Sequence, residues 1–155
     1  MALLQISEPG QSTAPHHHNL ACGIDLGTTN SLVASVMSGQ TRLISDQNNN
    51  SMLPSVVHYG QDKMTVGADA YQYTTTDPTN TILSVKRYMG VDYSEASEFK
   101  NLPYKLVKNG NNVSFKTSIG DVSAIEVSAS ILSALKDRAE DALGGELKGA
   151  GITVP

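Results

Sequence analysis

The sequence predicts an α/β domain that contains a mixed sheet. Residues 123–143 follow a helical pattern and lead directly into the apolar segment GAGITVP at residues 149–155. A long helix followed by an apolar strand is typical of α/β proteins, in which that strand lies inside a sheet. Near the other end of the chain, three strand-like segments are joined by short links, which favours antiparallel pairing of neighbours.

The bulk composition excludes several classes of protein. The 155 residues suit one domain or one lobe of a larger one, and 39% hydrophobic residues are enough to form a core. With a net charge of −4, the chain lacks the basic stripe that nucleic-acid binding needs. It has no apolar run near the ~20 residues of a membrane span, and residues 1–10 lack the features of a secretory signal. We therefore expect no nucleic-acid or membrane partner.

Cysteine usage indicates a reducing compartment. Cys22 is the only cysteine, so no disulfide can form within the chain, and we expect a cytoplasmic location. Because Cys22 lies in an apolar segment, we expect its thiol to be buried and unreactive.

The first 19 residues read as a flexible arm, because they contain two prolines and few apolar side chains after Ile6. The arm includes three consecutive histidines, His16, His17 and His18. A metal site is one interpretation, but consecutive residues of a regular element cannot all converge on one ion. A solvated tail is the favoured interpretation.

The middle of the chain alternates strand and helix signals. Residues 63–73 read as a strand that turns into a short helix at Gly67. Residues 79–90 read as a helix that Asn80 caps and Gly90 ends. Strands are expected at residues 21–27, 31–39, 40–46 and 55–59.

Two later segments carry clear signals. An Asn109-Gly110 turn between alternating runs predicts a β-hairpin. Ser123 and Glu126 predict a capping box at the start of the long helix, and Gly144 follows its end. The buried face of this helix is expected to consist of apolar residues at helical spacing, namely Ala124, Val127, Ile131, Leu135, Ala139 and Ala142.

The segment GIDLGTTNS, residues 23–31, carries the strongest chemical signal. Strand alternation places Asp25 on a face that it shares only with the small residues Ala21 and Gly23. A carboxylate is rarely buried without a partner, because desolvation costs several kcal/mol. A hydrated Mg²⁺, which needs few protein carboxylates, would provide that partner.

The residues after Asp25 can bind an anion. Gly27 is free to adopt a positive φ, and Thr28, Thr29 and Asn30 offer consecutive backbone N–H groups with polar side chains. A metal-binding acid beside phosphate donors suits a magnesium–nucleotide. The alternative is an ordinary polar hairpin turn, with Asp25 hydrogen-bonded to backbone, because turns favour the same residue types. The segment lacks the lysine of a P-loop, so a cation would come from elsewhere in the chain.

Lys86 is the candidate for that cation. On the predicted helix 81–89 it borders the apolar face formed by Ile82, Val85 and Met89, whereas Arg87 projects away. A lysine in this position either reaches to water or meets an anion, and the pattern leaves both possibilities open.

Several motifs, in order, resemble a known family. The segments GIDLGTTNS, LPSVV, VGADA and NTILSVKRYMG, followed by the helix and strand of residues 122–155, resemble the seventy-kilodalton heat-shock chaperones. These are the DnaK-like members of the actin-like ATPases. The resemblance implies an actin-like ATPase (ribonuclease H-like) fold. It implies that residues 20–155 are lobe I of the ATPase domain, truncated, with a smaller inserted α+β subdomain at about residues 52–122. The second lobe and the substrate-binding domain would be absent.

The same resemblance implies roles for individual residues. Asp25 would hold Mg²⁺ through its waters, and Lys86 would be catalytic, reaching the γ-phosphate and the attacking water. Arg87 and Pro155 would relay the nucleotide state to the substrate domain. The first phosphate loop would bind ATP or ADP, and it would consist of Gly27, Thr28, Thr29 and Asn30.

The opening MALLQISEPGQSTAPH resembles the N-terminal arm of the branch of this family devoted to iron–sulfur cluster assembly. This implies an ATP-dependent chaperone whose client is an iron–sulfur scaffold protein and whose helper is a J-domain co-chaperone. The alternatives are a general protein-folding chaperone, a small-molecule kinase of the actin fold, and a non-enzymatic interaction module. Because half of the nucleotide site would be missing, we expect the isolated chain to be inactive. We also expect it to self-associate, because a lobe without its partner lobe would expose apolar surface.

Overall fold

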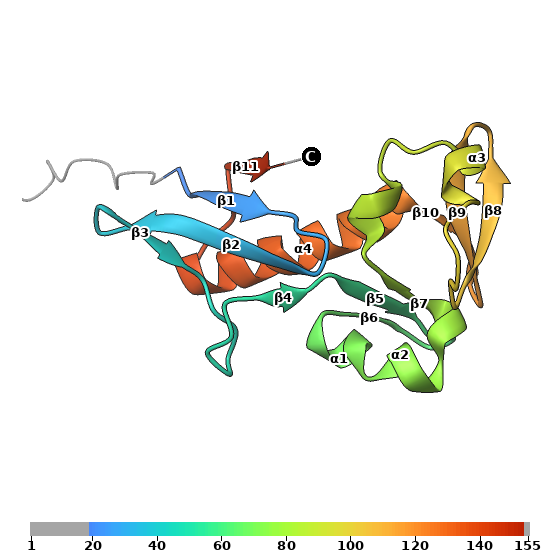
Figure 1. The fold of residues 1–155 in the computed structure, drawn as a ribbon. Helices are drawn as coiled ribbons and strands as arrows, with labels where there is room; N and C mark the ends of the chain where they lie inside the picture. Colours follow the sequence, from blue (N-terminus) through green and yellow to red (C-terminus); the bar gives the residue numbers. More distant parts are fainter. Residues whose placement is uncertain (1–18, 154–155) are drawn as a thin grey trace, which may run out of the picture.

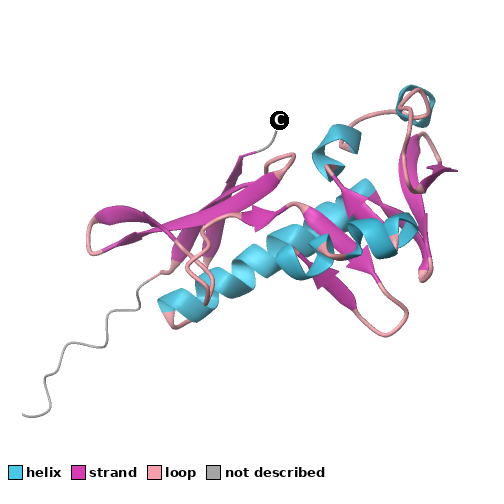
Figure 2. Ribbon diagram, turned by 60° about the horizontal axis from the view of Figure 1, so that its bottom comes forward, coloured by secondary structure: helices cyan, strands magenta, loops and turns pink. Residues whose placement is uncertain are grey.

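The computed structural model describes residues 19–153. A single long helix, α4 (Ala124–Leu143), runs through the middle of the molecule (Figure 1). One large sheet covers the C-terminal part of this helix, and two smaller sheets lie at its N-terminal end (Figures 1 and 2). Helix α4 contacts strands of all three sheets and so joins them through one core. The arm, His16 to His18, and Pro155 lie outside the described residues.

The large sheet is mixed, as predicted. Its order is β11-β1-β2-β3, with the short β4 (Leu53–Pro54) added to β2. Neighbours β1 (Ala21–Asp25), β2 (Asn30–Met37) and β3 (Gln40–Leu43) are antiparallel, whereas β11 (Gly149–Thr153) runs parallel to β1. The expectation that β11 lies inside the sheet is wrong for the described residues, because β11 is an edge strand and all five of its residues are exposed.

The two smaller sheets are antiparallel. One has the order β6-β5-β7, formed by Met64–Val66, Val56–Tyr59 and Thr81–Leu83. The other has the order β10-β9-β8, formed by Gly120–Ser123, Asn112–Thr117 and Lys105–Asn109. Short helical segments connect these strands: α1 (Ala68–Tyr71), α2 (Tyr73–Thr76), η1 (Pro78–Asn80), η2 (Val85–Tyr88) and α3 (Tyr93–Ala96).

The predicted helix at residues 79–90 is wrong. Residues 81–83 instead form β7, because they pair with β5 and the Ile82 side chain is fully buried in the core. Ser84 then adopts a left-handed conformation (φ 54°), which separates β7 from the single 3₁₀ turn η2. Asn80 does not cap a helix there, and its side chain binds Asp77 and the N–H of Ser118. Gly90 does adopt a positive φ of 75°.

Other local predictions are confirmed. Strand β6 turns into α1 at Gly67, whose φ is 77°. The hairpin β8–β9 forms, although Gly110 and Asn111 make its turn and Asn109 pairs with Asn112. Helix α4 has the capping box, since the Glu126 carboxylate accepts the Ser123 N–H at 2.7 Å and the Ser123 hydroxyl accepts the Glu126 N–H at 3.2 Å. Gly144 ends the helix with φ 71°.

The core of the large sheet is aliphatic. Cys22, Ile24 and Leu26 are buried against α4, and burial raises the pKa of the Cys22 thiol, as expected for an unreactive cysteine. All but one of the apolar positions predicted for the buried face of α4 are buried. The exception is Ala142, which lies in the exposed last turn.

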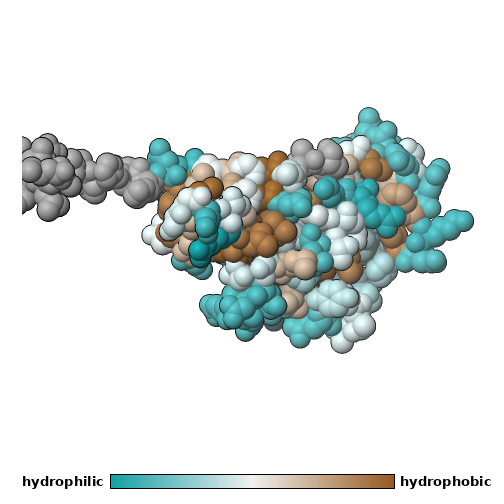
Figure 3. All heavy atoms as spheres, turned by 60° about the vertical axis from the view of Figure 1, so that its left-hand side comes forward, coloured by the Kyte–Doolittle hydropathy of each residue, from teal (hydrophilic) through white to brown (hydrophobic). Residues whose placement is uncertain are grey.

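The outer surface of this sheet is partly apolar. Val36 on β2 and Leu43 on β3 are more than half exposed, and so is Met52 before β4. Figure 3, which turns this end of the molecule forward, shows brown apolar surface between teal polar patches. Within residues 19–153, no helix is both long enough and apolar enough to span a membrane.

A polar cluster holds α2 and η1 against the β6-β5-β7 sheet. His58 on β5 is buried, its ring stacks on Tyr73 at 3.8 Å, and its Nε2 lies 3.0 Å from an Asp77 oxygen. Asn80 donates a second hydrogen bond to the same carboxylate. The hydrogen bond from His58 is the main cause of the lowered pKa of Asp77.

Candidate functional site

Asp25 ends β1 with its side chain on the outer face of the large sheet. As predicted, this face is shared with Ala21 and Gly23, and a Cβ added at Gly23 would have no atom within 4 Å. The Asp25 carboxylate accepts a 2.6 Å hydrogen bond from the hydroxyl of Thr153, which pairs with it on β11. The partner of Asp25 is therefore a side chain from the far end of the chain, and not local backbone.

The turn after β1 exposes the side chains of Thr28, Thr29 and Asn30 to solvent. The reason for a glycine at position 27 differs from the prediction, because Gly27 does not adopt a positive φ. A Cβ at Gly27 would instead overlap the carbonyl oxygen of Asn30. The turn therefore needs a glycine for close backbone approach rather than for a left-handed conformation.

Two buried serines hold the backbone of this turn. The Gly27 N–H donates to the Ser31 hydroxyl at 3.2 Å, and the Ser55 hydroxyl donates to the Gly27 carbonyl at 2.8 Å. The two hydroxyl oxygens lie 2.9 Å apart, and each serine is only 1% exposed. The Ser55 N–H also donates to the carbonyl of Thr29 at 2.8 Å. The turn is thus fixed from both sides by groups that solvent does not reach.

The Gly27 N–H, the Ser31 hydroxyl, the Ser55 hydroxyl and the Gly27 carbonyl form a closed ring of hydrogen bonds. The direction of each bond follows from the number of protons that each group carries. A hydroxyl group has one proton, and that of Ser55 is used by the Gly27 carbonyl, which can only accept. The proton between the two serines must therefore belong to Ser31. The Gly27 N–H is also used, so donors for an anion have to come from Thr28, Thr29 and Asn30. Both backbone groups of Gly27 are thus used to hold the shape of the turn.

Lys86 lies on η2, which stands next to the β1–β2 turn on the same side of α4 in both ribbon views (Figures 1 and 2). Lys86 is half-buried, and within residues 19–153 no carboxylate lies within 4 Å of its ammonium group. Arg87 is exposed, and its guanidinium lies 4.9 Å from the centre of the Phe99 ring. The contrast between a half-buried Lys86 and an outward Arg87 matches the sequence prediction, although the element is a 3₁₀ turn.

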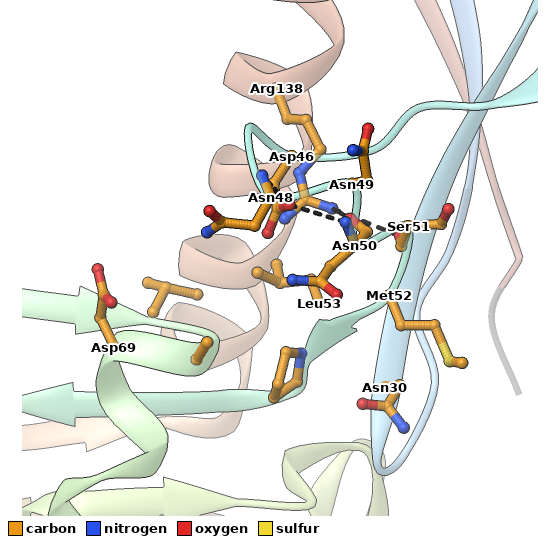
Figure 4. Close-up of a pocket in the computed structure, with 13 residues that line it drawn as sticks. Asn30, Asp46, Asn48, Asn49, Asn50, Ser51, Met52, Leu53, Asp69 and Arg138 are labelled. Carbon is orange, nitrogen blue, oxygen red and sulfur yellow. Dashed lines mark hydrogen bonds between the residues drawn. The ribbon is translucent and has the colours of Figure 1, made fainter.

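A polar pocket of about 570 Å³ adjoins the other side of the turn (Figure 4). Asn30 and the loop 46–51 line it. The Asp46 carboxylate accepts the N–H groups of Asn48 and Asn50, which lowers its pKa, and Arg138 from α4 donates to the Asn50 carbonyl. Neither Asp25 nor Lys86 lines this pocket. These hydrogen bonds fix the shape of the loop.

The residues around Asp25 fit a hydrated magnesium ion. Its carboxylate is exposed, the neighbouring position at Gly23 leaves open space, and donors for phosphate follow in the next turn. Within the described residues, no group of three or more His, Cys, Asp or Glu side chains is placed to hold a metal. A single carboxylate suits an ion that keeps most of its waters and takes its remaining ligands from a nucleotide.

The sequence prediction missed three positions at this site, namely Ser31, Ser55 and Thr153. Ser55 lies inside the LPSVV motif and Ser31 ends the GIDLGTTNS segment, so both belong to motifs that the sequence analysis had singled out. Ser31 binds Gly27 only four residues away, but Ser55 binds Ser31 and Gly27 across 24 and 28 residues, and no local rule connects those. Thr153 is 128 residues from Asp25 in the sequence.

Comparison with known proteins identifies the family. Residues 21–155 match the family model described as Hsp70 protein, so the chain belongs to the Hsp70 family. The chain is similar to proteins named "Chaperone protein HscA homolog". It is 55% identical to that of Aliivibrio salmonicida over 157 aligned residues, 54% to that of Haemophilus influenzae over 157, and 56% to that of Chromobacterium violaceum over 156. Each alignment covers 100% of this chain and 25% of the relative, so the chain spans about a quarter of their length.

Proposed function

We propose that this chain carries one half of the nucleotide site of an ATP-dependent chaperone. Residues 20–155 would form lobe I of an actin-like ATPase domain, with an inserted subdomain at about residues 52–122. Membership in the Hsp70 family, whose members are ATPases, supports this proposal. The single observation that carries it is the exposed Asp25 carboxylate at the end of β1, directly before a polar turn that buried serines hold rigid.

Each residue of this site has a proposed role. Asp25 holds Mg²⁺ through its waters, and Thr28, Thr29 and Asn30 donate to phosphate oxygens. Bound magnesium would neutralise charge that develops on the phosphates. Lys86 stabilises charge on the γ-phosphate and positions the attacking water. This role is supported by the half-buried position of the residue and by the absence of a carboxylate within 4 Å of its ammonium group in residues 19–153.

The proposed client is an iron–sulfur scaffold protein, and the proposed helper is a J-domain co-chaperone. Similarity over the whole chain to proteins named HscA homologues supports this assignment, as does the resemblance of the N-terminal arm. Arg87 and Pro155 would relay the nucleotide state to a substrate domain. The Arg87 guanidinium packs on the ring of Phe99, which follows α3, and this contact holds the Arg87 side chain in place. Pro155 lies two residues beyond Thr153 in the sequence.

The test uses the full-length protein that contains this segment. Lys86→Ala should lower the ATP hydrolysis rate by about 10²- to 10³-fold, because it removes a charge that acts in the transition state. The matched control is Lys63→Ala, an exposed lysine in the turn between β5 and β6, which should leave the rate unchanged.

The client is tested in the same assay. An iron–sulfur scaffold protein should stimulate hydrolysis, and a J-domain protein should increase it further. Stimulation by a sugar, with phosphate transferred to it, would instead support the kinase alternative. Equal stimulation by any unfolded polypeptide would support a general folding chaperone.

A further inference from the structure

We propose that Thr153 is a positioning residue for the Asp25 carboxylate, a role that rests on the proposed function of Asp25. The two residues are partners in the parallel pairing of β1 with β11, so their side chains stand side by side on the outer face of the sheet. Their side chains are joined by the 2.6 Å hydrogen bond from the Thr153 hydroxyl to Asp25 Oδ1.

The hydroxyl proton of Thr153 has one good acceptor. The carbonyl oxygen of Ile24 lies 3.5 Å from the same hydroxyl, whereas Asp25 Oδ1 lies at 2.6 Å, a length typical of a hydrogen bond to a charged carboxylate. Because the Thr153 hydroxyl is held at a fixed register position beside Asp25, this bond fixes the rotation of the carboxylate. It also leaves Oδ2 as the oxygen available to a ligand.

The surroundings of Asp25 offer little other support. The neighbouring positions on this face of the sheet are Gly23 on β1, Gly151 on β11 and Leu32, which pairs with Asp25 on β2. A Cβ at either glycine would find no atom within 4 Å, and the apolar side chain of Leu32 can give the carboxylate no hydrogen bond. Among residues 19–153, the Thr153 hydroxyl is the only group that donates a hydrogen bond to the Asp25 carboxylate. Without it, the carboxylate would have no hydrogen bond within the described residues to fix its rotation.

This rotation matters for an ion that is held through water. Hydrogen bonds behind a metal-binding group orient that group, and their loss typically costs 10- to 100-fold in metal affinity. The ordinary structural interpretation is that threonine stands here only because it suits a strand. Valine suits a strand equally well, so replacing Thr153 with valine separates the two interpretations.

The experiment measures ADP binding to the full-length protein by calorimetry, with Mg²⁺ present and with Mg²⁺ removed by a chelator. Thr153→Val should reduce the gain in ADP affinity that Mg²⁺ provides by about 10-fold, and should leave the Mg²⁺-free affinity unchanged. Thr153→Ser keeps the hydroxyl and should behave as the wild type. Thermal unfolding of each variant checks that the fold is retained.

Asp25→Asn separates the failure of this inference from failure of the proposed function. If Asp25→Asn removes the Mg²⁺-dependent gain while Thr153→Val retains it, Thr153 does not position the carboxylate. Loss in Thr153→Ser equal to that in Thr153→Val would also overturn the role of the hydroxyl. If Asp25→Asn itself keeps the full gain, the assignment of Mg²⁺ to Asp25 fails, and the inference fails with it.

Discussion

The hydroxyl oxygens of Ser31 and Ser55 lie 2.9 Å apart in the interior, although 24 residues separate them in the sequence. Through this contact the residue between β4 and β5 holds the turn that follows β1. The ring that includes both Gly27 backbone groups is closed, and each of its protons is used once. A turn fixed in this way keeps its exposed donors in place before a ligand arrives, which reduces the entropy lost on binding.

Replacing Ser55 with alanine should lower the free energy of unfolding by about 1–3 kcal/mol, because the partly buried Gly27 carbonyl and the buried Ser31 hydroxyl each lose a partner. Urea unfolding measures this change. Ser51→Ala is the matched control, because the hydroxyls of Ser45 and Ser51 also lie 2.9 Å apart but are only partly buried. Ser51→Ala should lower the free energy of unfolding by clearly less than Ser55→Ala does.

The double variant Ser31→Ala/Ser55→Ala tests whether the two serines act as a unit. Its cost should be smaller than the sum of the two single costs by at least about 0.5 kcal/mol, because contacting residues are coupled. Strictly additive costs would contradict a closed ring.

Gly27→Ala should distort the turn, because the added Cβ meets the backbone oxygen of Asn30, which cannot move aside easily. We expect a loss of about 1–3 kcal/mol in unfolding free energy and weaker nucleotide binding in the full-length protein. Gly23→Ala is the matched control for the unfolding measurement, because the same methyl group enters open space on the same sheet. Equal effects of the two substitutions would show that close approach is not the reason for Gly27.

The pair of His58 and Asp77 predicts a dependence of stability on pH. The pKa of Asp77 is lowered from its ordinary value of 3.8, so its contribution is present above that pH and is lost as the pH falls through the lowered pKa. The difference in unfolding free energy between the wild type and Asp77→Asn should therefore be larger at pH 7 than near pH 3. Denaturant unfolding at both pH values measures it, with the exposed Asp62→Asn as control. A difference that stays constant with pH would contradict the prediction.

The edge strand β11 predicts self-association of the 155-residue chain. All five of its residues are exposed, none is charged or proline, and Ile152 is 43% exposed. Light scattering should show a mass that rises with concentration. Ile152→Lys should reduce this rise, whereas Ile119→Lys, a similar change in the exposed turn between β9 and β10, should not. A monomer at all concentrations would refute the prediction.

The 155-residue chain alone should hydrolyse ATP slowly or not at all. The outer face at Asp25 is open to solvent, and positioning provides most of the catalysis of phosphoryl transfer. A phosphate-release assay compares the chain with a protein-free blank. Steady hydrolysis that Lys86→Ala abolishes would contradict this expectation.

Local patterns were sufficient for features that depend on neighbours in the sequence. The capping box of Ser123 and Glu126, the end of α4 at Gly144 and the alternation of Cys22, Ile24 and Leu26 follow from short-range geometry. The position of Asp25 on an outer face with small neighbours follows from the same alternation. These features could therefore be predicted before any contact was known.

Only the tertiary structure decided the features that join distant segments. Residues 81–83 form a strand because β5 offers a pairing partner, which outweighs a helical spacing that the sequence alone favoured. The ring through Ser55 and the bond from Thr153 to Asp25 depend on strand register, which brings together side chains that are far apart along the chain. Composition and spacing determined the sheet, the long helix and the acid with its polar turn, whereas packing determined what holds that acid and that turn in place.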